Sequence, residues 1–302
     1  MQLTSVKRVH VELLCAITAA VLLGAMPARA EHLEAKMYAI SDWDTECPGG
    51  DRDMWDDMAD NWYDEITDHG WYHRAGRLVN GNIDRDIFCD PDTGLANCDD
   101  GSRLDAADAA IIALHGADSG NHWRGSLRRN GGASVNDCNI DGSESAVPNG
   151  ELHAGDVDLE FLHLSSCYSM DDDNLPFTYF NFEDAVDSPG NGRRLHQLDG
   201  FHGLMWIGGC CDDQYEDFAD DAFDVSIKDA WLDNMYVTGI NGSATQCPVA
   251  YAVGRDRNDC FDRIDHERYN NVRSDPGAIG YYCYYYYDGC DPDGETPFDD
   301  PN

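Results

Sequence analysis

Short apolar runs, each bounded by polar segments, recur along the chain. They span residues 37–40, 109–114, 157–164, 203–208 and 248–253. A run without alternation is typical of a strand buried on both faces, as in a parallel sheet. Apolar residues at three- and four-residue steps also predict an amphipathic helix over 55–66, ended at Gly70, and one long or two short helices over 218–235. Alternating strands and helices predict an α/β fold, with a mostly parallel sheet and helices on both faces.

The first 30 residues have the features of a secretion signal. Lys7 and Arg8 form a positive start, an apolar stretch runs from about 13 to 23, and residues 28–30 (Ala-Arg-Ala) predict cleavage before Glu31. The apolar stretch is too short to span a bilayer comfortably as a helix. We therefore expect a protein that is secreted or periplasmic, with no membrane attachment once the signal is removed.

The rest of the chain has the length of one large domain. We expect this domain to cover residues 31–280, with a long polar insertion around 118–156. A tyrosine-rich segment and an acidic tail make up residues 281–302, and the tyrosines suit an edge strand. The sequence leaves the oligomeric state open.

The charge of the chain is strongly negative. Lys and Arg number 20 against 58 Asp and Glu, a net charge of −38. Removal of residues 1–30 takes away three basic residues and one acidic residue, which leaves −40. Such a surface repels nucleic acid and anionic membranes, so neither is expected as a partner. A solvated acidic coat is the simpler interpretation, and cation binding is the alternative.

Cysteine usage supports an oxidising compartment. One of the 12 cysteines lies in the signal, so 11 remain, and an odd count leaves at least one thiol unpaired. Five disulfides and one free thiol are the simplest arrangement. Short spacings favour the pairs Cys89–Cys98, Cys247–Cys260 and Cys283–Cys290, although sequence alone does not fix the connectivity. We expect Cys210 and Cys211 to be in disulfides, with each other or with distant partners.

Two of the apolar runs end in reactive side chains. The run AIIALHG ends in His115-Gly116, and LEFLHLSSC ends in Cys167. Ligand sites in open parallel sheets form beyond the carboxyl ends of strands, so neighbouring strands would bring this imidazole and this thiol together. A nearby imidazole favours the thiolate, which is the nucleophile. His163, on the same strand as Cys167, is expected to be structural.

The order of these motifs resembles the caspase-like cysteine peptidases. The wider sequence is similar to a family of secreted bacterial caspase-like domains, through the segments LDAADAAIIALHG, LSSCYS, DGFHGLMWIGG and KDAWLDNMY, and the likeness covers roughly residues 37–253. The resemblance implies a three-layer caspase-like fold, here stabilised by disulfides. It also implies His115 as general acid and base, Cys167 as nucleophile, and the backbone N–H groups of Gly116 and Cys167 as an oxyanion hole. Ser166 stands where alanine is common before the cysteine, and no P1-binding residue is recognisable.

The resulting hypothesis is a cysteine endopeptidase that cleaves a peptide or protein substrate through a thioester, with no cofactor needed for catalysis. One alternative is a non-catalytic binding module on the same fold. The other is a calcium-dependent structural or surface protein.

Two further motifs bear on metal binding. Asp137, Asn139, Asp141 and Ser143, with Gly142, match the first half of a calcium loop, in which oxygen ligands alternate before a sharp turn. The usual twelfth-position Glu is replaced by Pro148, and Glu151 is the candidate substitute, so the half-motif predicts bound Ca²⁺ on that basis. His69 and His73 lie four residues apart, but without an accompanying Glu base they do not predict a catalytic zinc site.

Overall fold

The structure is a computed structural model of the 302-residue chain. It describes residues 33–43, 47, 49–81, 83–89, 97–120, 122–128, 138–142, 152, 154–155, 157–171, 195–207, 213–240, 244–277 and 279–292. The predicted signal, residues 1–30, lies outside these ranges. Cys210 and Cys211 also lie outside them.

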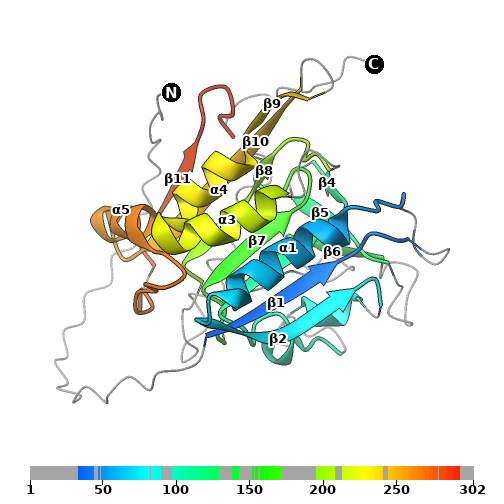
Figure 1. The fold of residues 1–302 in the computed structure, drawn as a ribbon, viewed down its shortest axis with the longest axis horizontal. Coiled ribbons are helices and arrows are strands. Elements are labelled where there is room, and N and C mark those ends of the chain that lie inside the picture. Colours follow the sequence, from blue (N-terminus) through cyan, green and yellow to red (C-terminus); the bar gives the residue numbers. More distant parts are fainter. Residues whose placement is uncertain are drawn as a thin grey trace.

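The centre of the fold is a mixed, mostly parallel sheet (Figure 1). Five adjacent strands are parallel, in the order β8-β7-β3-β1-β2, and β10 and β11 continue the sheet in antiparallel fashion, with β9 paired to β10. The strands are β1 (Leu33–Ala39), β2 (Tyr72–Val79), β3 (Ala109–Ala113), β7 (Phe161–Ser165), β8 (Gln197–His202), β9 (Val237–Ile240), β10 (Ala244–Gly254) and β11 (Tyr281–Tyr286). The predicted α/β class and the tyrosine-rich edge strand are thus confirmed.

Four α-helices are found in the described residues, and they lie on one face of the sheet (Figure 1). They are α1 (Trp55–Asp68), α3 (Asp213–Asp224), α4 (Ile227–Met235) and α5 (Arg257–His266). Trp62 of α1 and Trp231 of α4 both contact the His163 ring of β7. On the same side, Cys260 of α5 packs with Ala252 of β10. Of the two alternatives for residues 218–235, the structure has two short helices. The second helix starts anew because Ser226 caps α4 by accepting from the Asp229 N–H.

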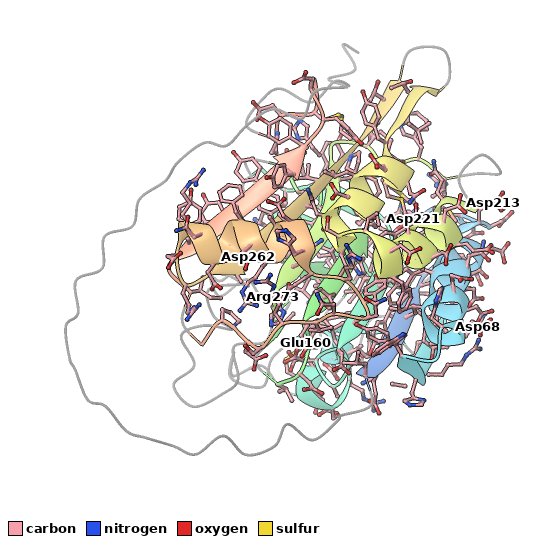
Figure 2. The ribbon with its side chains drawn as sticks, turned by 60° about the vertical axis from the view of Figure 1, so that its left-hand side comes forward. Asp68, Glu160, Asp213, Asp221, Asp262 and Arg273 are labelled. Atoms are coloured by element: carbon pink, nitrogen blue, oxygen red, sulfur yellow. A yellow bond between two sulfur atoms is a disulfide. The ribbon has the colours of Figure 1, made fainter. Side chains whose placement is uncertain are left out.

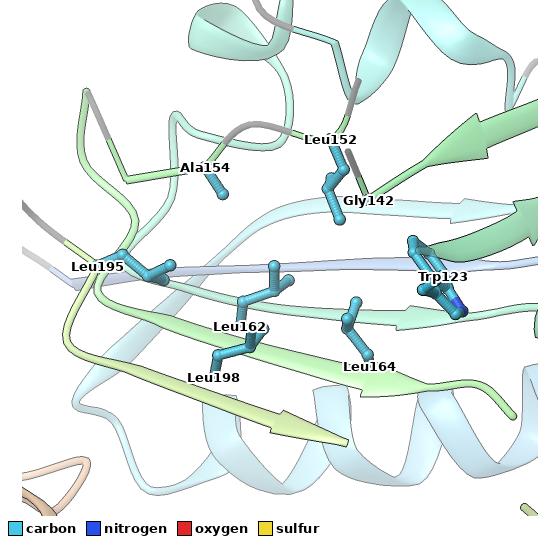
Figure 3. Close-up of a pocket in the computed structure, with 8 residues that line it drawn as sticks. All are labelled: Trp123, Gly142, Leu152, Ala154, Leu162, Leu164, Leu195 and Leu198. Atoms are coloured by element: carbon cyan, nitrogen blue, oxygen red, sulfur yellow. The ribbon is translucent and has the colours of Figure 1, made fainter. Parts of the chain in front are cut away.

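Loops and a small antiparallel sheet cover part of the opposite face. This sheet consists of β4 (Gly116–Asp118), β5 (Trp123–Ser126) and β6 (Asn139–Asp141); β5 and β6 lie within the expected insertion, and β4 leads into it. Figure 3 shows an apolar pocket between it and the main sheet, lined by Trp123, Gly142, Leu152, Ala154, Leu162, Leu164, Leu195 and Leu198. Two 3₁₀ helices, Arg85–Ile87 and Asp100–Ser102, lie in the loop before β3. A layer of helices on this face stays a prediction.

The strand predicted at 203–208 is wrong. The strand in this part of the chain is β8, which ends at His202, and residues 203–207 after it have no regular structure. Every residue of β8 is buried, yet Gln197, Asp199 and His202 are polar. Their polarity hid the strand from a search for apolar runs.

A row of buried hydrogen bonds explains the polar residues of β8. Asp199 lies 2.8 Å from Nδ1 of His163, whose Nε2 lies 2.8 Å from the Tyr269 hydroxyl. The Trp62 indole donates to that hydroxyl at 3.0 Å, and the Gln197 amide donates to Asp199. Buried polar groups need such partners, so the expected structural role of His163 agrees with its surroundings.

Four disulfides lie in the described residues. The pair Cys89–Cys98 is confirmed, but the predicted pairs Cys247–Cys260 and Cys283–Cys290 are wrong. The disulfides are Cys247–Cys290, Cys260–Cys283 and Cys47–Cys138, besides Cys89–Cys98. The antiparallel pairing of β10 with β11 sets these partners instead. It places Val249 opposite Tyr286, so Cys247, two residues before Val249, lies near Cys290, which follows β11.

Candidate functional site

The ends of β3 and β7 lie side by side. These strands are adjacent and parallel, and Ala113 pairs with Ser165. His115 and Cys167 each lie two residues beyond this pair. The Leu114 N–H donates to the Ser165 carbonyl at 3.3 Å and extends the pairing beyond the strands. The predicted adjacency of the two strands is therefore confirmed.

Gly116 sits where the two strand ends touch. A Cβ at this position would lie 2.1 Å from the Cys167 carbonyl oxygen and 2.2 Å from Ser166 Oγ. These separations are shorter than any side chain tolerates, so the His115-Gly116 backbone runs directly against Ser166-Cys167. Ser166 is fixed in turn, because its hydroxyl accepts from the Trp123 indole at 3.1 Å.

His115 is half-buried and held in a defined orientation. Its ring lies between two indoles, with centroids 4.5 Å from Trp43 and 4.7 Å from Trp55. Nε2 donates to the Gly50 carbonyl at 2.7 Å, since a carbonyl only accepts. Burial lowers the pKa of His115, with the hydrogen bond to Gly50 acting in the opposite direction. The neutral ring therefore carries its proton on Nε2 and leaves Nδ1 as the basic nitrogen.

Cys167 is the free cysteine of the described residues and is partly exposed. Its sulfur lies against the Met205 backbone, accepting from the N–H at 3.4 Å and facing the carbonyl oxygen at 3.6 Å. Burial raises the pKa of the Cys167 thiol, whereas the hydrogen bond to Met205 lowers it. The Met205 amide is thus a donor already directed at the charge that a thiolate would carry.

The turn after Cys167 is anchored to the end of β8. Tyr168 has a left-handed backbone, with φ of 59°, and its N–H donates to the Gly203 carbonyl at 2.6 Å. The Gly203 N–H donates to Oδ1 of Asp171 at 2.6 Å. The same oxygen lies 2.8 Å from Nδ1 of His202. Such backbone strain persists only where the surroundings enforce it, and these contacts supply that enforcement.

Arg52 acts electrostatically on both groups. It lies in the loop between β1 and α1, is exposed, and donates from Nη1 to the Asp51 carbonyl at 3.0 Å. Its positive charge lowers the pKa of His115 and also that of Cys167. Within the described part of the chain, no carboxylate forms an ion pair with its guanidinium.

The sequence did not reveal Gly50, Met205, Arg52 or the two tryptophans as parts of this site. Gly50 and Met205 contribute backbone groups, which leave no side-chain signature. The tryptophans and Arg52 follow β1, and β1 pairs with β3. A prediction of that pairing would have placed the loop after β1 at the same sheet edge as His115.

The calcium half-motif is only partly described. Asn139 and Asp141 lie in β6, while Asp137 and Ser143 are outside the described residues. Asp141 is fully buried, and Arg124 donates to one of its oxygens at 2.6 Å and to the other at 3.5 Å. A cation at Asp141 would compete with this guanidinium, and Ca²⁺ binding stays a prediction.

Comparison with models of known protein families and with curated proteins finds no match. In the described residues, no helix has the length and apolar character needed to cross a bilayer.

Proposed function

We propose that the chain is a secreted or periplasmic cysteine hydrolase of the caspase-like type, and that His115 and Cys167 cleave peptide bonds. The observation that carries the proposal is the contact between the ends of β3 and β7, which places the His115-Gly116 backbone directly against Ser166-Cys167. Four disulfides support an oxidising location.

The resting pair is neutral on this proposal. Burial lowers the pKa of His115 and raises the pKa of Cys167, so both shifts disfavour an imidazolium–thiolate pair near pH 7. The proton of Cys167 then passes to Nδ1 of His115 as the sulfur attacks the substrate carbonyl carbon. The Met205 N–H stabilises the charge on the sulfur before the new C–S bond forms.

The remaining steps return the enzyme to its starting state. The tetrahedral oxyanion is held by the N–H groups of Gly116 and Cys167. When it collapses, the C–N bond breaks and His115 gives its proton to the leaving amine. Water then attacks the thioester and loses a proton to His115, and that proton returns to the Cys167 sulfur as the acid product leaves.

A non-catalytic binding module on the same fold is the alternative. The raised pKa of Cys167 favours it, because a thiol that stays protonated is a weak nucleophile.

A peptide-library digest followed by mass spectrometry separates the two. The chain from Glu31 onward is compared with Cys167→Ala, His115→Ala and a matched control, His266→Ala, whose imidazole is exposed on α5. We expect cleavage by the wild type and the control, and none by the other two variants. Cleavage that persists in Cys167→Ala overturns the proposal. An inactive wild type whose Cys167 reacts with iodoacetamide no faster than glutathione supports the binding module.

A further inference from the structure

Three side chains with metal-binding groups meet on the outer surface of the helical layer. Nε2 of His69, at the C-terminal end of α1, lies 3.0 Å from Oε1 of Glu65 and 3.0 Å from Oδ1 of Asp220 on α3. Each residue offers one ligand atom, and the three atoms lie within 4.8 Å of one another. Trp55, which contacts His115, is at the opposite end of the 14-residue α1, about 20 Å away at 1.5 Å per residue. The cluster is therefore separate from the candidate hydrolase site.

The spacing of the three atoms suits a small tetrahedral cation. Zinc binds nitrogen and oxygen ligands at about 2.0–2.2 Å, so neighbouring ligand atoms around it are about 3.3–3.5 Å apart. The two measured separations of 3.0 Å are close to that value. Small side-chain rotations would therefore admit the ion without movement of either helix.

The imidazole is held in place before any ion binds. Its ring stacks on Phe223 of α3, with centroids 4.0 Å apart and planes at 17°. Glu65 lies one helical turn before His69, on the same face of α1. The side chains of His69, Glu65 and Asp220 are 31%, 25% and 63% exposed, which leaves room for water as a further ligand.

Acidic residues around the cluster favour the binding of a cation. Figure 2 shows Asp213 and Asp221 on α3 and Asp68 at the end of α1, so the surface of this helix pair is acidic. A negative field of this kind concentrates cations. Carboxylates alone suit Mg²⁺ and Ca²⁺, whereas an imidazole shifts the preference toward Zn²⁺.

We propose that Glu65, His69 and Asp220 form a Zn²⁺ site, completed by water, that cross-links the end of α1 to α3. Binding at this site ties together two helices that are far apart in sequence. Zinc should therefore raise the melting temperature as well as bind.

The test is calorimetric titration with ZnCl₂ of tag-free protein carrying Cys167→Ser, which removes the free thiol of the described residues as a competing ligand. Millimolar Mg²⁺ in the buffer occupies sites made of carboxylates alone. We expect His69→Gln and Asp220→Asn each to weaken zinc binding at least about tenfold, since loss of outer-sphere partners alone costs about 10- to 100-fold. The zinc-dependent rise in melting temperature should disappear with them.

His266→Gln is the matched control. His266 is also exposed on a helix, with Nδ1 3.2 Å from an oxygen of Asp262 one turn earlier, but it is not part of a three-ligand cluster in the described residues. This variant should keep wild-type affinity. Melting curves without zinc show that each variant is folded. The proposal is overturned if the parent protein binds no zinc under these conditions, or if His69→Gln and His266→Gln bind it equally well.

Discussion

Replacement of Gly116 by alanine tests the contact between the two strand ends directly. The added Cβ would lie 2.1 Å from the Cys167 carbonyl oxygen, 2.2 Å from Ser166 Oγ and 2.7 Å from Trp123 Nε1. Ordinary contacts of a Cβ are longer than 3.0 Å, so the His115-Gly116 backbone must move about 1 Å away from Cys167. The nearest atom belongs to the backbone, so a change of rotamer does not relieve the clash.

Two consequences follow from this displacement. Overpacking of this kind costs about 1–3 kcal/mol, which for a domain of this size lowers the melting temperature by about 2–12 °C. A misplacement of about 1 Å between reacting groups costs about 100-fold in rate, so peptide cleavage should fall by about that factor. Both effects are measurable, by thermal unfolding and by cleavage of a substrate found in the library digest.

Gly76→Ala in β2 is the matched control. A Cβ at Gly76 meets only the side chain of Lys36, at 3.5 Å, which is an ordinary contact. This variant should have wild-type stability and activity. If Gly116→Ala behaves like Gly76→Ala in both assays, the close approach of the two strand ends is not real and the reasoning about the site fails.

Three other predictions concern electrostatics and cross-links. Arg52→Gln removes a charge that lowers the pKa of Cys167, so the pH profile of iodoacetamide alkylation should move to higher pH; an unchanged or lower midpoint would contradict the role given to Arg52. Serine at both Cys47 and Cys138 opens a disulfide between residues 91 apart, which the chain-entropy model values at about 4–5 kcal/mol, to be measured by chemical denaturation. Burial raises the pKa of Asp108 to about 6, above its ordinary 3.8, so its contribution to stability is present at low pH and is lost as pH rises through about 6. The stability of Asp108→Asn relative to wild type should therefore increase by about 2–3 kcal/mol from pH 4 to pH 7, and a constant difference would refute this.

The sequence predicted elements well where burial and polarity agreed. Strand β3 is entirely apolar, β7 is apolar apart from His163 and Ser165, and both are fully buried. Helix α1 carries its apolar residues on one face, so simple patterns located all three. Prediction failed where polar residues are buried together, as in β8, because a hydrogen bond between Asp199 and His163 replaces the hydrophobic signal. The helix α5 was missed for a different reason. Only Cys260, Arg263 and Ile264 of its ten residues are buried, so it has no apolar face that a pattern could reveal.

The candidate site was predictable only in its side chains. The order of His115 and Cys167 at two strand ends is visible in the sequence, and the adjacency of β3 and β7 follows from the usual rules for parallel sheets. The Gly50 carbonyl and the Met205 amide depend on how two loops return to the sheet edge. Disulfide pairing was equally hidden, because it follows from strand direction in β10 and β11 rather than from spacing.

The buried row that joins Asp199, His163 and Tyr269 has a consequence for folding fidelity. A slip of β8 by one residue would turn Asp199 to the other face of the sheet and leave His163 without its carboxylate. A sheet with the wrong register therefore loses more free energy here than it would lose if the core were entirely apolar. Gly203 and Met205 lie just after β8. The correct alignment of β8 therefore also places the Met205 N–H against the Cys167 sulfur.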